Sequence, residues 1–86
     1  MVRSGFDARF PKRSSHVART LGRNVQRLRK DRGWTQDELA AKLEVEQMAV
    51  SLIENARANP TLETIEALAA CLGVRFVDLF EVRTMK

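Results

Sequence analysis

A shortage of metal-binding and nucleophilic side chains limits the chemistry open to this chain. Its 86 residues include one cysteine, Cys71, and one histidine, His16. A single cysteine cannot form an intrachain disulfide or a four-cysteine zinc site. We interpret Cys71 as a small packing residue, since free cysteine packs in that way. We therefore expect no metal and no cofactor, and the cysteine usage favours a reducing cytoplasm.

Long apolar runs and strand patterns are also missing. No stretch approaches the roughly 20 apolar residues of a membrane span, and the N-terminus has no apolar segment of the secretory type. No alternating β-branched run is present. The apolar residues recur at helical spacing, so the sequence predicts one compact all-α domain of five helices, with no membrane association.

Enzymatic side-chain patterns are absent from the sequence as well. The chain has no glycine-rich phosphate loop and no serine or cysteine nucleophile paired with a histidine. Glu44 and Glu46 could suggest paired carboxylates, but they flank a predicted turn with no second catalytic group nearby. We expect solvated turn residues there, no enzymatic activity and no small-molecule ligand.

The net charge of +4 is unevenly distributed. Residues 1–32 hold ten Lys and Arg against two Asp, a charge of +8, whereas residues 33–86 hold five against nine acidic residues, a charge of −4. Basic segments attract polyanions; a solvated basic tail and helix face is the alternative. Residues 1–14 show no helical period, so we interpret them as a flexible basic arm, although such arms can also enter a minor groove or pad a dimer partner.

Residues 36–55, QDELAAKLEVEQMAVSLIEN, contain the most informative pattern. The spacing predicts helices over 36–43 and 47–55, joined by a tight turn at Glu44 and Val45. One side of the second helix is apolar, and the other presents small hydrogen-bonding side chains. This arrangement is typical of a helix-turn-helix, whose second helix enters the major groove of DNA.

Helix start and stop signals define the rest of the chain. Thr35 and Glu38 match a capping box, and Gly33 suits the end of the preceding helix. That helix is expected to begin at Ser14 or Ser15, and a fourth helix to begin at Thr61 and end at Gly73. The side chains expected to face the core from these two helices are Val17, Leu21, Val25, Leu28, Leu62, Ile65, Leu68, Ala69 and Leu72.

Three segments agree in order and spacing with a known family. They are LRKDRGWTQDELA at 28–40, VSLIEN at 50–55 and NPTLETIEALAACLGV at 59–74. The chain from Leu21 to Phe80 resembles the helix-turn-helix regulators of the Cro-and-repressor type, also called the xenobiotic-response-element (XRE) family. The resemblance implies a repressor-like fold with its helix-turn-helix at the second and third helices, and double-stranded DNA as the partner.

The resemblance also implies the residues that contact DNA, although each could be an ordinary polar surface residue. Phosphates would be held by Thr35, Gln36, Asn55 and Arg57, and the unpaired N–H groups at a helix N-terminus suit that role. The specificity positions are Gln47, Met48, Ser51 and Leu52. Because glutamine can pair with adenine and apolar side chains suit the thymine methyl, we expect A·T pairs in the target.

An ion pair and three departures complete the comparison with the family pattern. Arg29 and Glu54 match a pair that bridges the first helix to the third, which would fix the angle of the reading helix. The family's glycines are replaced by Glu44 and Ala56, which would each cost about 1 kcal/mol if φ is positive. Glu46 replaces the usual cap of the third helix.

Residues 15–86 are expected to form the DNA-binding domain, ending in a fifth helix near 76–81 that mediates dimerisation. This helix has more apolar side chains than it can bury in its own domain, which predicts a twofold interface. These side chains are Phe76, Val77, Leu79 and Phe80. We expect a sequence-specific transcriptional regulator that binds a pseudo-palindromic operator as a homodimer through the major groove. The alternative is a protein-interaction module, an antitoxin or adaptor, on the same fold.

Overall fold

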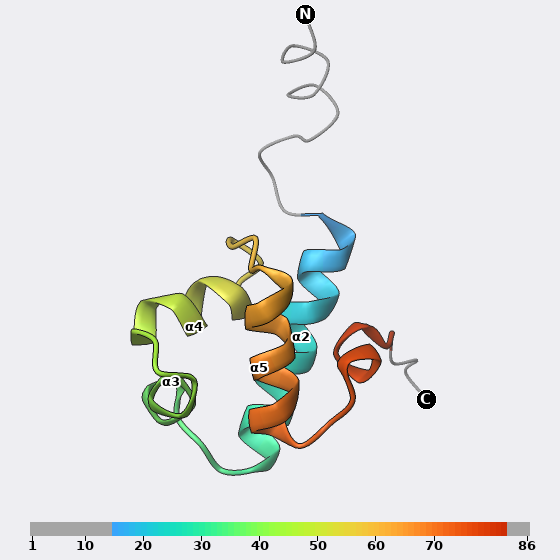
Figure 1. Cartoon of the computed structure of the whole chain (residues 1–86). Helices are drawn as coiled ribbons and strands as arrows, with labels where there is room; N and C mark the ends of the chain where they lie inside the picture. The colour runs from blue at the N-terminus through green and yellow to red at the C-terminus, as the bar shows by residue number, and fades with distance from the viewer. Residues whose placement is uncertain (1–14, 83–86) are drawn as a thin grey trace, which may run out of the picture.

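The computed structural model describes residues 15–82, which form four α-helices and one short 3₁₀-helix (Figure 1). The elements are α2 (His16–Asp31), α3 (Gln36–Leu43), α4 (Gln47–Glu54), α5 (Leu62–Leu72) and the 3₁₀-helix η1 (Phe76–Phe80). The all-α class is confirmed, whereas the prediction of a fifth α-helix is wrong. The expected basic arm, residues 1–14, lies outside the described residues.

Local hydrogen bonds explain why η1 is not an α-helix. The Asp78 backbone N–H donates to the Arg75 carbonyl, three residues back, at 2.9 Å. The Asp78 carboxylate accepts from the Arg75 backbone N–H, and the Arg75 guanidinium holds the pKa of Asp78 below its ordinary value. Asn24 Nδ2 donates to the carbonyls of Leu79 and Glu81 at 2.8 and 2.9 Å. The end of the segment is therefore bonded to α2 rather than continued as a helix.

The predicted helix boundaries follow from caps that the structure contains. Ser15 Oγ accepts from the N–H of Ala18 at 3.0 Å and begins α2. Thr35 and Glu38 form both bonds of the capping box at the start of α3. Gly33 precedes that cap with a φ of +72°, a conformation that glycine adopts at little cost. These boundaries are confirmed.

The helices enclose a small core in which α2 packs on α4, α5 and η1, while α3 packs on α4 and α5. Two predicted core positions are wrong: Val17 is 57% exposed and Leu62 is 70% exposed. Both lie in the first turn of their helices, ahead of the first buried apolar residues, Leu21 and Ile65. The largest fully buried side chains are Leu39, Leu68, Leu72, Leu79, Val25 and Val50.

Two residues of α2 that the sequence analysis did not single out control its packing. Gly22 lies against the end of α4, where a Cβ would stand 2.6 Å from the carbonyl oxygens of both Ile53 and Glu54. Asn24 is buried and bonds η1 as described above. A glycine in the interior of a helix was the available signal for the first contact. Each helix within residues 15–82 is too short or too polar to span a bilayer.

Candidate nucleic-acid interface

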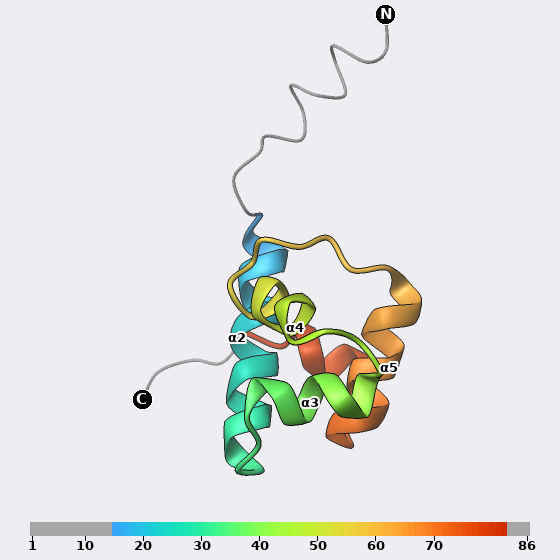
Figure 2. The same cartoon turned by 90° about the vertical axis from the view of Figure 1, so that its left-hand side faces the viewer.

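The helix pair α3 and α4 forms one outer side of the molecule (Figure 2). The turn between them closes at Glu44, which has a φ of 61°, and the Val45 N–H donates to the Ala40 carbonyl at 3.0 Å. Ala56, after α4, has a φ of 60°. Both non-glycine residues are therefore in the left-handed region, which L side chains adopt at a cost of about 1 kcal/mol or slightly more.

Helix α4 divides into a buried side and an outward side. Val50, Ile53 and Glu54 are buried against the domain. The four predicted specificity residues share the other side: Gln47, Met48 and Leu52 are exposed and Ser51 is half-buried. Met48 is 59% exposed, so its thioether side chain meets solvent rather than core. The structure therefore places all four together on a surface that an external partner can reach.

The predicted phosphate-contacting residues lie beside this surface. Thr35 and Gln36 lie at the start of α3. The side chain and the backbone N–H of Thr35 are both hydrogen-bonded to Glu38 in the capping box. Asn55 ends α4, where its Nδ2 donates to the Ser51 carbonyl at 2.8 Å. The Arg57 side chain is exposed. The first turn of α3 and the end of α4 therefore present polar groups next to the outward face.

Glu46 does not cap α4 through its side chain. It is the residue before the helix and has extended backbone angles, but its carboxylate makes no cap hydrogen bond. The side chain is exposed. The absence of this bond leaves donors at the start of α4 without the side-chain partner that a serine or threonine cap would supply.

The Arg29 and Glu54 side chains meet in a two-pronged ion pair between α2 and α4. Arg29 Nε lies 2.6 Å from Glu54 Oε2, and Nη2 lies 3.0 Å from Oε1. Both residues are buried, and the bond to the carboxylate raises the pKa of Arg29. Arg29 Nη1 also donates to the Trp34 carbonyl at 2.7 Å. The pair therefore ties the end of α4 both to α2 and to the loop before α3.

Gln36 and Gln47 are joined, a link the sequence analysis did not foresee. Gln36 Nε2 donates to Glu54 Oε1 at 2.9 Å, and Gln47 Nε2 donates to Gln36 Oε1 at 2.5 Å. Both glutamines occupy the first position of their helices. The sequence signal that could have predicted this contact was the presence of a glutamine at the first position of each of two consecutive helices. A phosphate-contacting candidate and a base-reading candidate are thus parts of one hydrogen-bonded chain.

The proposed dimer residues do not all face outward. Leu79 has no exposed surface and belongs to the core, so its inclusion in an interface is wrong. Phe80 is half-buried against the core, with its ring centroid 5.6 Å from that of Phe76. Phe76 is 38% exposed and Val77 is 59% exposed. Only part of the apolar surplus predicted for this segment is therefore available to a partner.

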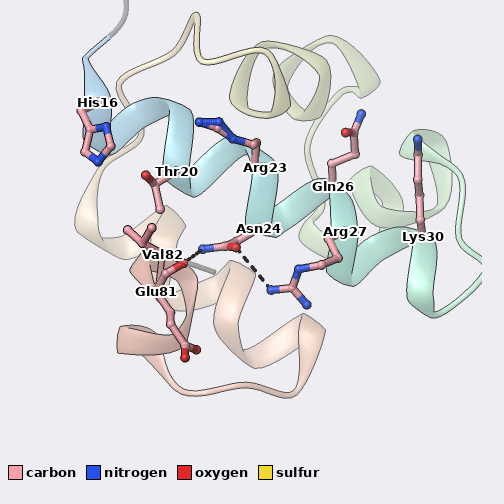
Figure 3. Close-up of a pocket in the computed structure, with 9 residues that line it drawn as sticks. All are labelled: His16, Thr20, Arg23, Asn24, Gln26, Arg27, Lys30, Glu81 and Val82. Carbon is pink, nitrogen blue, oxygen red and sulfur yellow. Dashed lines mark hydrogen bonds between the residues drawn. The ribbon is translucent and has the colours of Figure 1, made fainter. Parts of the chain in front are cut away.

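A groove of about 520 Å³ runs along the outer side of α2, beside the end of the described chain (Figure 3). Asn24 lies in it and bonds the Glu81 carbonyl, and Arg27 Nη2 donates to Asn24 Oδ1 at 3.3 Å. Arg23 and Lys30 add positive charge along the same helix (Figure 3).

Within residues 15–82, no cluster of three or more His, Cys, Asp or Glu could hold a metal ion.

Comparisons with known proteins agree with this architecture. A family model described as Helix-turn-helix (HTH_3) matches residues 25–79. The chain is 41% identical over 63 residues to an uncharacterised HTH-type transcriptional regulator, y4dJ, of Sinorhizobium fredii, covering 73% of this chain and 82% of that protein. It is 39% identical over 56 residues to the immunity repressor of Bacillus phage phi105, covering 65% of this chain but only 39% of the repressor.

A solved structure extends the agreement to three dimensions. The biofilm regulator SinR, crystallised in complex with DNA, superposes with a TM-score of 0.66 at 31% identity, over 71% of this chain and 98% of that one. The members of the family named here are transcriptional regulators rather than enzymes. The chain thus belongs to the XRE-type helix-turn-helix family of DNA-binding transcription regulators.

Proposed function

We propose that the protein binds a pseudo-palindromic operator as a homodimer, with α4 of each protomer in the major groove. The observation that supports this most strongly is the outward face of α4, where Gln47, Met48, Ser51 and Leu52 lie together over a buried and ion-paired base. A base-reading helix needs this combination of free polar atoms and rigid support. Two half-sites about one helical turn apart would match a twofold protein.

The same arrangement separates base reading from phosphate contact. Gln47 can offer an acceptor and a donor to adenine, while Met48 and Leu52 suit the thymine methyl. The N-terminus of α3 offers backbone N–H groups and a positive dipole end to a phosphate beside Gln36. Arg57, exposed beyond the end of α4, supplies a cation for the next phosphates.

The dimer is proposed to form through η1. Phe76 and Val77 are partly exposed on this segment, so a partner that covers them gains part of the about 1.5–3 kcal/mol that full burial of each side chain contributes. Twofold pairing is the commonest way to cover an apolar patch in a homo-oligomer. In this proposal residues 15–86 are the DNA-binding domain, residues 1–14 are its basic arm, and η1 supplies the dimer contact.

Selection of bound sequences from random DNA, with the full chain, tests the proposal. We expect enrichment of a pseudo-palindrome containing A·T pairs. Gln47→Ala should weaken the selected site by about 1–3 kcal/mol and leave unrelated DNA nearly unaffected, whereas Arg57→Ala should weaken both. Failure to enrich any sequence would contradict specific DNA binding.

A protein-interaction module is the second candidate, an antitoxin or adaptor built on the same fold. The observation that favours it is the composition of α4, which has no Lys or Arg and exposes Met48 and Leu52. An apolar outward face can dock a protein as well as DNA. This candidate predicts that the same selection yields no sequence preference, although the protein is folded.

A further inference from the structure

A row of basic side chains follows the outer side of α2. Arg23, Arg27 and Lys30 line the groove described above, and their spacing of four and then three residues places them next to one another on the helix surface (Figure 3). Among the described residues that line the groove, Glu81 is the only acidic one. Figure 3 shows its carboxylate directed away from Arg23 and Lys30. The groove therefore carries a net positive charge.

Two of these cations are available to an external anion. Arg23 and Lys30 are exposed, and neither forms an ion pair in the part of the chain that the structure describes. Arg27 differs, because its Nη2 donates to Asn24 Oδ1 and its Nη1 lies 3.9 Å from Asp31 Oδ2. Arg27 is thus held in place by its own helix, whereas the other two cations can turn toward a ligand.

The floor of the groove is closed by a fully bonded amide. The Asn24 Nδ2 group donates one N–H to the Leu79 carbonyl and the other to the Glu81 carbonyl, while Oδ1 accepts from Arg27. Val82, which also lines the groove, is an exposed apolar side chain. A ligand would therefore be recognised by its negative charge, with apolar surface beside it, rather than by the floor.

The position of the groove around α2 separates it from the outward face of α4. Gly22 lies against the end of α4, whereas Asn24 bonds the chain beyond η1. At 3.6 residues per turn, these two directions differ by roughly 200° around the helix. The floor of the groove is therefore turned away from α4, and DNA on the outward face of α4 need not cover it.

The length of the basic row suits an extended peptide. Arg23 and Lys30 are seven residues apart, which is about 10 Å along a helix. An extended peptide covers that distance with about three residues, and its alternate side chains point to the same side. Acidic side chains at alternate positions would then meet both cations, and a carboxylate can accept two parallel bonds from an arginine.

We propose that this groove binds an acidic, extended segment of a second protein and leaves α4 free for DNA. The ends of this chain do not complement the groove, because residues 1–14 hold four Lys or Arg against one Asp, and residues 83–86 hold two and no acidic residue. Duplex DNA is the competing polyanion. A protein segment is favoured over it by the apolar Val82 and by a floor that is turned away from α4.

Fluorescence anisotropy of the full chain, with a labelled peptide of alternating glutamate and alanine about eight residues long, tests the proposal. We expect saturable one-to-one binding, which the same peptide with glutamine for glutamate should not show. Arg23→Gln/Lys30→Gln should lower the affinity about fivefold or more, as the loss of two exposed ion pairs predicts. Lys42→Gln/Arg75→Gln removes the same charge from exposed positions outside the groove and should change the affinity less than about twofold.

Amide chemical shifts of isotope-labelled protein locate the bound peptide. The peptide should shift the amides of α2 and of residues 79–82, and the Arg23→Gln/Lys30→Gln protein should keep its affinity for duplex DNA within about twofold. Shifts centred on α4, equal binding of the two peptides, or a loss of DNA affinity as large as the loss of peptide affinity would each overturn the proposal. The peptide titration contains no DNA, so its result stands even if the protein selects no operator and the proposed function fails.

Discussion

Gly22→Ala tests whether the distance between α2 and α4 is determined by a missing side chain. The added Cβ would lie 2.6 Å from the carbonyl oxygens of Ile53 and Glu54, where ordinary contact begins at 3.4 Å. Both oxygens belong to the backbone of α4, so neither can move without its helix. The substitution must therefore push the end of α4 away from α2 or strain both helices.

Two opposing effects determine the magnitude. Overpacking of a core position costs about 1–3 kcal/mol, and rigid backbone on one side favours the upper end of that range. Alanine offsets about 1 kcal/mol of this through its better helix propensity. We expect a net loss of about 2 kcal/mol in the free energy of unfolding.

Urea denaturation followed by circular dichroism measures this loss as a lower midpoint at an unchanged m-value. Gln26→Ala, at an exposed position of the same helix, should stay within about 0.5 kcal/mol of the unmodified protein. The outward face of α4, which is proposed to read bases, should also shift, so DNA affinity should fall in the folded variant. A Gly22→Ala protein that is more stable by about 1 kcal/mol, as propensity alone predicts, would refute the close approach.

Three further predictions concern the ion pair, the strained turns and the dimer. Chemical denaturation of Arg29→Met, Glu54→Leu and the double variant should show that each single change costs more than the double, since one change leaves a buried charge uncompensated; additive losses would contradict the coupling. Glu44→Gly and Ala56→Gly should each raise the free energy of unfolding by up to about 1 kcal/mol by relieving positive φ, and a destabilised variant in both cases would contradict the strain. Phe76→Asp should give a folded monomer in sedimentation with reduced operator affinity, and a monomeric unmodified protein at tens of micromolar would exclude the dimer.

The helix boundaries could be predicted from the sequence because their causes are local. The Thr35–Glu38 capping box and the Ser15 and Thr61 caps each join residues three apart, and Gly33 needs only its own φ. Such interactions depend on neighbouring residues alone. The helix-turn-helix, its outward side chains and the family resemblance could therefore all be recognised before any packing was known.

The burial of individual apolar residues depended on the tertiary structure. Helical spacing placed Val17 and Leu62 in the core, yet within residues 15–82 both side chains are exposed, in the first turns of their helices. It assigned Leu79 to an interface, yet that side chain has no exposed surface. A periodic pattern identifies the apolar side of a helix, but it does not say how far along the helix a neighbour extends.

The contacts that aim α4 also lie beyond what local sequence determines. Asn24 reaches carbonyls 55 and 57 residues away, Arg29 and Glu54 are 25 apart, and Gln36 and Gln47 are 11 apart. Gly22 matters only because α4 crosses α2 at that point. The sequence by itself determined the four α-helices, the side-chain caps of α2, α3 and α5, and the family. The family resemblance had already predicted the Arg29–Glu54 pair, which the structure contains. Packing alone decided that Asn24 meets the chain beyond η1 and that Gln36 meets Gln47, because each of these bonds joins different elements whose separation is a property of the whole core.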